Sequence, residues 1–448
     1  MIAIKICRKW MRDRSGYINS ERGIGEAKER GNMQNIGKKL GYCIAILFGA
    51  VVIGSIFLLV AYALPMGKIH QHINESLVVL NKEGKYPQEC EGDLETQRDN
   101  FTDALMLDIA GFDNGKSLTE QAFGNYYIAS DKPNPIFWLQ LEDSDPQQEI
   151  SYARYWHGYV VLLKVCLLFF NYQEIRSLLY FADLLLVGWL VIAFWRKGRR
   201  QYMIPLFITL MFFPLTVVSK SLQFSTVFIP TFTEMILLLN KEQSVEGYER
   251  IFLGAGILIA FLDLLTYPLV NLGFLLCVML LVYQDQDLTY KVKRVINYAV
   301  AWLVGYAGMW ASKWLVSGIF LKTNVLQDAM TAAAFRTSNT NGKTTWTYYD
   351  VVMNNVKKCP KMVLFLCIIY ALFLAVQMVR KKYALCYRND AAIWLAIAVL
   401  PFVWYLFLQN HSYMHVFFTH RNLSITCLAV LFGMSSNVRP IKAPLTGK

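Results

Sequence analysis

Two carboxylates, Asp99 and Asp103, have the spacing that acid–base chemistry at a membrane surface would use. They stand four residues apart in DNFTDALMLD, so a helix would place both on one face while neighbouring apolar side chains dip into the lipid interface. Partial burial against such neighbours raises the pKa of a carboxyl toward neutrality, which suits a general base acting on a hydroxyl. We therefore predict that Asp103 or Asp99 is a catalytic acid or base. The alternative is that both lie on a solvated helix face.

Basic side chains crowd a second stretch, HSYMHVFFTHR, where the last apolar segment begins. It includes His415, His420 and Arg421, and charged groups at membrane depth are costly unless they bind a partner. Such groups suit an anion, above all a phosphate head group held beside a carboxylate. The alternative is that basic residues at the end of a span reach the interface and bind nothing specific. Further candidates for this site are Arg154, His157, Asp263, Arg336 and Lys343.

The sequence contains no pattern for a metal or a nucleotide. Its nine cysteines are scattered, without a C-x-x-C pair or a metal-binding spacing with histidine. It also lacks a P-loop, a G-x-S-x-G turn and an H-E-x-x-H helix. Cys90 and Cys359 could pair in an oxidising compartment, but we expect two free thiols. No metal site is therefore predicted, and the need for a divalent cation stays open.

Composition points to a membrane protein. Hydrophobic residues make up 55% of the 448 residues and charged residues only 17%, and the charges cluster between apolar runs of spanning length. The net charge of +12 comes from Lys and Arg blocks beside these runs, which is typical of cytoplasmic loops rather than of a nucleic-acid surface. The chain is therefore predicted to be an all-α polytopic membrane protein with no nucleic-acid partner.

The charge pattern also predicts an orientation. Residues 1–39 contain ten Lys and Arg against four acids and should form a cytoplasmic tail. Residues 40–64 then cross the membrane and deliver a large outer loop, residues 65–157, which holds 16 of the 32 acidic residues. A second outer loop covers residues 321–361, and residues 436–448 form a second cytoplasmic tail. Both termini are thus expected on the inner side of a cell membrane.

One apolar run, residues 155–172, is expected to lie in the interface or to re-enter rather than to cross. It is short and contains Lys164, and if it crossed, the basic block at residues 196–200 and every later basic loop would lie outside. About ten spans then make up a transmembrane domain over residues 40–435. The other nine spans are expected near residues 177–195, 202–219, 222–239, 251–267, 269–283, 295–320, 362–379, 391–409 and 416–434.

This layout resembles the GT-C superfamily of integral-membrane glycosyltransferases, in particular bacterial members that modify surface polysaccharides. The likeness rests on the cytoplasmic start, the single span and the large outer loop that follows it. It also rests on the segment RYWHG with its apolar tail, on FLDLLTYP around Asp263, and on THR at the last span. The sequence lacks the family's adjacent acidic pair after the first span and its Trp-Trp-Asp motif, which leaves the base undefined.

The resemblance implies a donor and an acceptor. Members take a sugar from a polyprenyl-phosphate carrier, a membrane lipid, and transfer it to a glycan, lipid or protein on the outer face. By this likeness, Asp99 or Asp103 would activate the acceptor hydroxyl. Arg421 and His420 would hold the carrier phosphate, with Arg336 or Lys343 as secondary partners. The alternatives are a polysaccharide polymerase or ligase, and a lipid or solute transporter or flippase.

Overall fold

The computed structural model describes residues 37, 39–129, 148–386 and 390–441, and the chain forms two units, residues 1–52 and 53–448. Within the described residues nearly all regular structure is helical, with four short strands that pair as β1–β2 and β3–β4. This agrees with the predicted all-α membrane class. The predicted terminal tails lie largely outside the described residues, as do Glu142, Asp143 and Asp145 of the predicted large outer loop.

Five described helices are long and apolar enough to cross a membrane, against the ten predicted. They are Lys39–Tyr62, α6 (Tyr172–Arg196), α9 (Leu222–Asn240), α15 (Lys361–Val379) and the segment Val416–Ser436. The last of these is built from α18 (Val416–Thr419), η4 (His420–Asn422) and α19 (Leu423–Ser436). The apolar lengths therefore identified half of the expected spans.

The other predicted spans are short, broken or too polar. Residues 202–219 divide into η3 (Arg200–Tyr202), α7 (Met203–Leu210) and α8 (Leu215–Val218), because Pro214 cannot continue the helix. α11 (Leu269–Val282) and α16 (Ala391–Phe407) are apolar but shorter than the five. α10 (Val245–Leu262) carries Glu246, Glu249 and Arg250 in its first turns. α12 (Leu288–Leu321) is long, but Gly, Tyr and Trp lower its mean hydropathy.

The run that was expected not to cross forms α5 (Tyr159–Leu167). Its nine residues span only about 14 Å, less than half of a hydrocarbon core of about 30 Å. α6 starts a few residues later, where Asn171 and Glu174 form a reciprocal capping box. The prediction that residues 155–172 make no crossing of their own is therefore supported by the length of α5.

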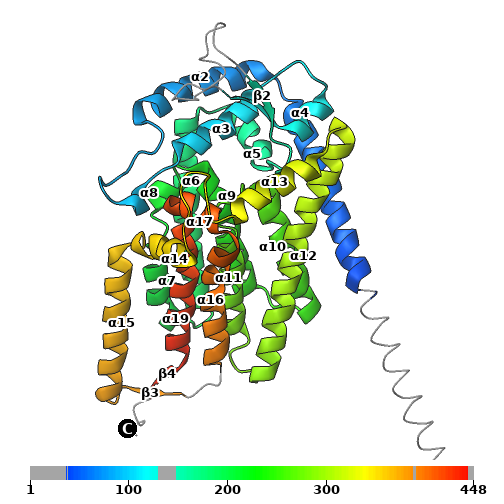
Figure 1. Cartoon of the computed structure of the whole chain (residues 1–448). Coiled ribbons are helices and arrows are strands. Elements are labelled where there is room, and N and C mark those ends of the chain that lie inside the picture. Colours follow the sequence, from blue (N-terminus) through cyan, green and yellow to red (C-terminus); the bar gives the residue numbers. More distant parts are fainter. Residues whose placement is uncertain (1–36, 38, 130–147, 387–389, 442–448) are drawn as a thin grey trace, which may run out of the picture. The chain divides into compact units, whose positions relative to one another are not determined.

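The elements between the first helix and α6 form a layer over one end of the bundle in the second unit (Figure 1). We call this end the layer end. The layer consists of α2 (Met66–Glu83), η1 (Leu94–Thr96), α3 (Asn100–Gly111), α4 (Leu118–Gly124), the hairpin β1 (Tyr126–Ala129) and β2 (Gln148–Ser151), and α5. The expected helix in the acidic loop is thus α3, which begins where the Asp99 side chain accepts a hydrogen bond from the Thr102 amide.

At the opposite end of the second unit, β3 (Tyr383–Leu385) pairs antiparallel with β4 (Val438–Pro440). Arg380, Lys381 and Lys382 lie beside this pair, and we call it the basic end. The predicted second outer loop contains α13 (Val325–Thr337) and α14 (Tyr348–Lys357), followed after α16 by α17 (Gln409–Met414). These three helices lie nearer the layer end than β3 and β4 (Figure 1).

Hydrogen bonds from Lys313 and the close packing of α10 on α12 hold the layer end together. Lys313 of α12 is fully buried and donates hydrogen bonds to the Phe123 carbonyl (3.1 Å) and to Asn125 Oδ1 (2.8 Å), which ties α12 to the end of α4. α10 and α12 pack backbone to backbone, since a Cβ on Gly256 would lie 2.1 Å from the Trp302 carbonyl oxygen. The layer is therefore fixed to a closely packed helix pair.

Candidate functional site

Asp99 and Asp103 both meet the first turn of α9, which places them on one side of α3 as predicted. Asp99 Oδ2 accepts hydrogen bonds from Thr102 Oγ1 (2.7 Å) and from the Gln223 side-chain amide. Asp103 Oδ2 accepts from the Tyr172 hydroxyl (2.5 Å), and its Oδ1 accepts from the Gln223 backbone amide (3.4 Å). Both carboxylates are almost completely buried and hydrogen-bonded, so in this conformation a substrate hydroxyl does not reach either one.

Arg176 supplies the positive charge on this side of the layer. Its guanidinium donates to Glu83 Oε2 (2.9 Å) and to Asn100 Oδ1 (2.8 Å), and Arg98 donates to the other oxygen of Glu83 (3.0 Å). Burial raises the pKa of Asp103 to about 7, although Arg176 works against this rise. The pKa of Asp103 is thus raised toward neutrality by burial, as expected, while its role as a general base stays a prediction.

The first turn of α9 also reaches Arg421. The Arg421 guanidinium lies over the ring of Phe224, the residue after Gln223, at 4.4 Å from the ring centroid. Its nitrogens donate to the Phe417 carbonyl (2.7 Å) and to the Glu95 carbonyl (3.2 Å) of η1. Consecutive residues of one helix therefore contact the predicted base and the predicted phosphate ligand, but no contact joins the two directly within the described residues.

The start of the last span holds a concentration of buried polar atoms without partners. Within the described residues, six such atoms fall on one short stretch: Ser412 Oγ, His420 Nε2, Arg421 Nε, Asn422 Nδ2 and Oδ1, and Ser424 Oγ. All five side chains are fully enclosed by the protein. Buried polar groups are nearly always hydrogen-bonded in proteins, so a cluster of exceptions indicates a place that water or a ligand completes. Arg421 Nε and Asn422 Nδ2 are donors and the two serine hydroxyls can donate, which suits an anion. Asn422 Oδ1 and His420 Nε2 are acceptors, the latter because His420 Nδ1 donates to the Val416 carbonyl.

A second cationic group lies beside this stretch. Arg336 of α13 contacts His411 Nδ1 at 2.7 Å, and His411 packs against His415 with ring centroids 5.1 Å apart. Burial, together with the charge of Arg336, lowers the pKa of His415 to about 4 and that of His411 well below its ordinary value. Both imidazoles are therefore neutral at physiological pH. Within the described residues, no carboxylate forms a salt bridge with Arg336.

Asp263 belongs to the same region. It follows α10, is 2% exposed, and accepts hydrogen bonds from the Thr266 amide at 2.9 and 3.1 Å. Burial raises the pKa of Tyr155 to about 12, while Arg336 lowers it and Asp263 raises it. Arg336 and Asp263 are therefore both within electrostatic range of one tyrosine hydroxyl, which brings a cation and a carboxylate to the same part of the layer end.

Three predicted site residues remain. Arg154 and His157 bind other parts of the protein, and Lys343 is exposed. Arg154 forms a salt bridge with Asp328 of α13 (3.2 Å) and covers the ring of Tyr152. His157 contacts the Tyr159 hydroxyl (3.0 Å) and the Tyr152 carbonyl (2.9 Å), and burial lowers its pKa well below the ordinary value. The Lys343 side chain is exposed. Arg154 also lowers the pKa of Tyr155 and lies 5.7 Å from the centroid of its ring, so it belongs to the same region as Asp263 and Arg336, whereas Lys343 does not.

Two buried polar residues were not predicted as site residues from the sequence. Asp183, in the middle of α6, is fully buried, and neither of its carboxylate oxygens has a hydrogen-bond partner among the described residues. Asn422 is equally buried, with its whole amide unpartnered. Asp183 could have been found as the lone acid inside a predicted span, since ionisable residues at membrane depth are candidates for function by default. Asn422 gave no signal beyond its place next to Arg421.

Among the described residues, no group of three or more His, Cys, Asp or Glu side chains could hold a metal ion. Cys90 and Cys359 are free thiols, as expected. The sequence matches no protein-family model, and neither a characterised protein nor a solved structure was found to be similar to it.

Proposed function

We propose that the protein is a membrane glycosyltransferase that moves a sugar from a polyprenyl-phosphate carrier to a hydroxyl acceptor at the layer end. The observation that carries this proposal is the stretch from Ser412 to Ser424, where six buried polar atoms lack partners. Its donors, with Arg421 within it and Arg336 beside it, offer an anion both charge and hydrogen bonds. The GT-C-like layout with an outer-facing layer belongs to the same proposal.

The reaction needs a base and a cation, and the region offers both. The acceptor hydroxyl forms a bond to the anomeric carbon of the sugar while the bond from that carbon to the carrier phosphate breaks. A carboxylate takes the hydroxyl proton, and the released polyprenyl phosphate leaves with the electron pair and its negative charge. We assign the proton acceptor to Asp263, because Asp263 and Arg336 both act on the pKa of Tyr155. In this conformation Asp263 is buried and hydrogen-bonded, as Asp99 and Asp103 are, so the proximity to Arg336 alone decides the assignment.

Binding of the carrier tests the anion site without knowledge of the sugar. The full chain in nanodiscs would be titrated with polyprenyl phosphate and, as a matched ligand, with the uncharged polyprenol. We expect the phosphate to bind at least tenfold more tightly, and Arg336→Gln to remove most of that difference because it removes the charge. Arg336→Lys should retain part of it. Lys68→Gln, an exposed change on α2, is the control. Equal affinity for both lipids would contradict the site.

Transfer itself separates the competing functions. Proteoliposomes would be loaded with synthetic polyprenyl-phosphate monosaccharides, and release of polyprenyl phosphate would be followed. Asp263→Asn should abolish release while carrier binding persists, whereas loss of release in Asp103→Asn alone would move the base to α3. Turnover of lipid-linked oligosaccharides but not of monosaccharides would favour the polymerase or ligase alternative. Movement of an intact lipid or solute across the vesicle without bond cleavage would favour a transporter or flippase.

A further inference from the structure

A crevice lies between α15, α16 and α19, toward the basic end and away from the site described above. Its volume is about 390 Å³, and its lining is almost entirely apolar. The side chains that form it include Leu374, Met378, Trp394, Leu395, Val430 and Met434. At its foot it is bounded by the β3–β4 pair, since Leu385 and Val438 also line it. The crevice therefore runs along membrane-spanning helices and ends where the strands begin.

The helix on the open side of the crevice makes few contacts with the rest of the bundle. In the most apolar 18-residue stretch of α15, only 17% is buried, compared with 72% in the corresponding stretches of α9 and of the last span. Leu374 is one of its few buried side chains, while Leu372, Phe373 and Val376 are exposed. A helix that faces lipid on most of its circumference gives lipid chains access to the space behind it. An apolar space in contact with lipid is filled by hydrocarbon, because an empty one forfeits dispersion contacts.

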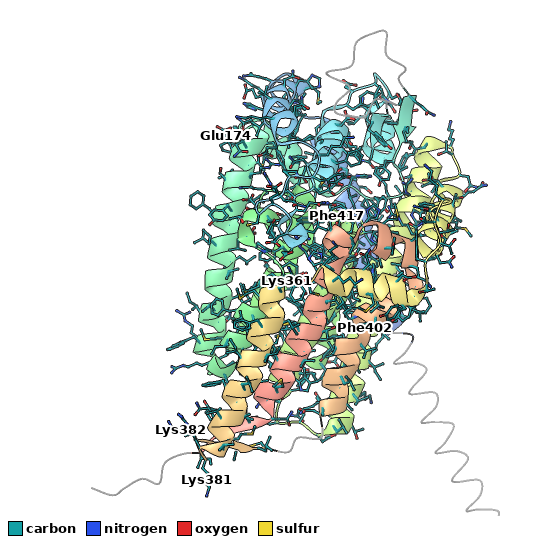
Figure 2. The ribbon with its side chains drawn as sticks, turned by 60° about the vertical axis from the view of Figure 1, so that its left-hand side comes forward. Glu174, Lys361, Lys381, Lys382, Phe402 and Phe417 are labelled. Atoms are coloured by element: carbon teal, nitrogen blue, oxygen red, sulfur yellow. The ribbon has the colours of Figure 1, made fainter. Side chains whose placement is uncertain are left out.

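Positive charge stands at the foot of the crevice. Arg380, Lys381 and Lys382 follow α15 directly, all three are exposed, and none forms a salt bridge within the described residues. Figure 2 shows Lys381 and Lys382 at the foot of α15, with Lys361 at the other end of the helix. Basic clusters that adjoin the ends of membrane helices attract anionic lipid head groups.

The wall of the crevice also carries an unsatisfied donor. Trp394, in the first turns of α16, lines the crevice and is 4% exposed, and its indole Nε1 has no hydrogen-bond partner among the described residues. The ring is held against α19, where a Cβ on Gly433 would lie 3.1 Å from Trp394 Cγ. A phospholipid carries ester and phosphate oxygens between its chains and its head group, and these are acceptors that such a donor needs.

We propose that the crevice binds one acyl chain of an anionic glycerophospholipid, whose head group lies against Arg380, Lys381 and Lys382. The apolar lining accepts the chain, the basic foot selects the charge, and the Trp394 indole faces the polar linkage between them. This site is distinct from the carrier site, which lies at the layer end, and it does not depend on the glycosyltransferase proposal.

The test uses phosphatidylglycerol with a photoreactive diazirine in one acyl chain, in nanodiscs of phosphatidylcholine that hold the full chain. Cross-linked residues would be mapped by mass spectrometry and compared with those from phosphatidylcholine carrying the same group. We expect phosphatidylglycerol to label Leu374, Met378, Val430 and Met434 at least fivefold more. Equal labelling by the two lipids would mean bulk lipid only and would overturn the proposal.

Variants separate charge from shape. Lys381→Gln/Lys382→Gln should reduce the specific labelling roughly tenfold or more, whereas Arg196→Gln/Lys197→Gln, which removes the same charge at the foot of α6, should not. Ala371→Phe should block the crevice, while Ala375→Phe on an exposed position of the same helix should leave labelling unchanged. No effect of the charge pair, or displacement of the label by polyprenyl phosphate, would overturn the assignment. Thermal unfolding of each variant confirms that it is folded.

Discussion

At the scale of single residues, the carboxylates of α3 differ from ordinary surface acids because they ionise inside the protein. Folding raises the pKa of Asp103 from 3.8 to about 7, mainly through burial. Between these two values the folded protein holds a proton that the unfolded chain has released, so stability falls as pH rises. Tyr172 and Gln223 provide the hydrogen bonds that make this ionisation tolerable.

The pH dependence of unfolding tests this property. We expect the apparent melting temperature of the purified protein to fall between about pH 4 and pH 7, and Asp103→Asn to flatten part of that slope because an amide does not ionise. Intrinsic fluorescence during heating measures the transition. Glu75→Gln, an exposed change on α2, should leave the slope as it is. A slope shared by wild type and Asp103→Asn would show that Asp103 does not hold the extra proton.

Replacement of Asn422 should leave stability unchanged or higher but weaken binding of the carrier. Its buried amide makes no hydrogen bond among the described residues, so Asn422→Leu is expected to keep or raise the apparent melting temperature. The same change should weaken polyprenyl phosphate binding about tenfold or more if the amide contacts the carrier. Asn355 is the matched control, because its buried amide bonds Val351, Ser412 and Thr419. Asn355→Leu should therefore destabilise by about 1–3 kcal/mol. Unchanged binding in Asn422→Leu would remove Asn422 from the site.

The positions of charged residues in the site could be predicted from the sequence better than their hydrogen-bond partners. His411 and Asp263 could be proposed from their positions at the ends of apolar runs, and Arg336 from its place in the polar second outer loop, and the structure brings them into one region. That Asp99 caps α3 and bonds Gln223 was not readable, because residue 223 is more than a hundred positions away and its pairing depends on tertiary packing. Unpartnered groups such as Asn422 become visible only when every neighbour is placed.

At the scale of elements, close packing of α10 on α12 depends on glycine. Gly256 has no room for a Cβ, which would lie 2.1 Å from the Trp302 carbonyl oxygen, and Gly305 faces the Leu253 carbonyl oxygen at the same distance. Gly254, on the same helix, has nothing within 4 Å of a Cβ position. The two positions therefore separate helix propensity from helix packing.

We expect Gly256→Ala to lower the apparent melting temperature and Gly254→Ala to keep or raise it. Alanine favours a helix by about 1 kcal/mol over glycine, and at position 254 nothing offsets this gain. At position 256 the backbones must separate, which loosens the pair that anchors Lys313. Thermal unfolding of the two variants in one detergent measures the difference. Equal shifts would mean that α10 and α12 are not in backbone contact.

Apolar length predicted elements well where the chain contained no breaker. The runs at residues 40–64, 177–195, 222–239 and 362–379 correspond to long helices. The prediction of one span at residues 202–219 was wrong, because Pro214 interrupts the helix. Mean hydropathy does not reveal this break, since the residues around Pro214 are apolar. The run at residues 251–267 ends early for a local reason, since α10 ends at Leu262 and the Asp263 side chain then accepts hydrogen bonds from the Thr266 amide in a turn.

At the scale of the whole second unit, the layer end and the basic end should lie on opposite sides of a membrane. The positive-inside rule assigns Arg380, Lys381 and Lys382 to the cytoplasm and the acidic layer to the outside. Cys90 is exposed in the layer and provides a natural probe of this orientation.

An impermeant thiol reagent checks the orientation. Cys90 should react in intact cells, whereas Lys381→Cys, in a background with Cys7→Ser and Cys90→Ser, should react only after the membrane is opened. Arg199→Cys in the same background should behave like Lys381→Cys. Reaction of Arg199→Cys in intact cells would mean that residues 155–172 cross the membrane after all and that α6 runs in the other direction.

The layer is held by hydrogen bonds to segments that are synthesised after it, and this constrains the order in which the chain can fold. The ribosome delivers α3 long before Gln223 of α9, and η1 long before Arg421, which donates to the Glu95 carbonyl. Until those partners are synthesised, Asp99 and the η1 backbone have no permanent contacts on that side, and Lys313 must also arrive before α4 is anchored. A nascent chain therefore carries its acidic segment unfinished through most of translation, and a chain that stops before residue 421 cannot complete it.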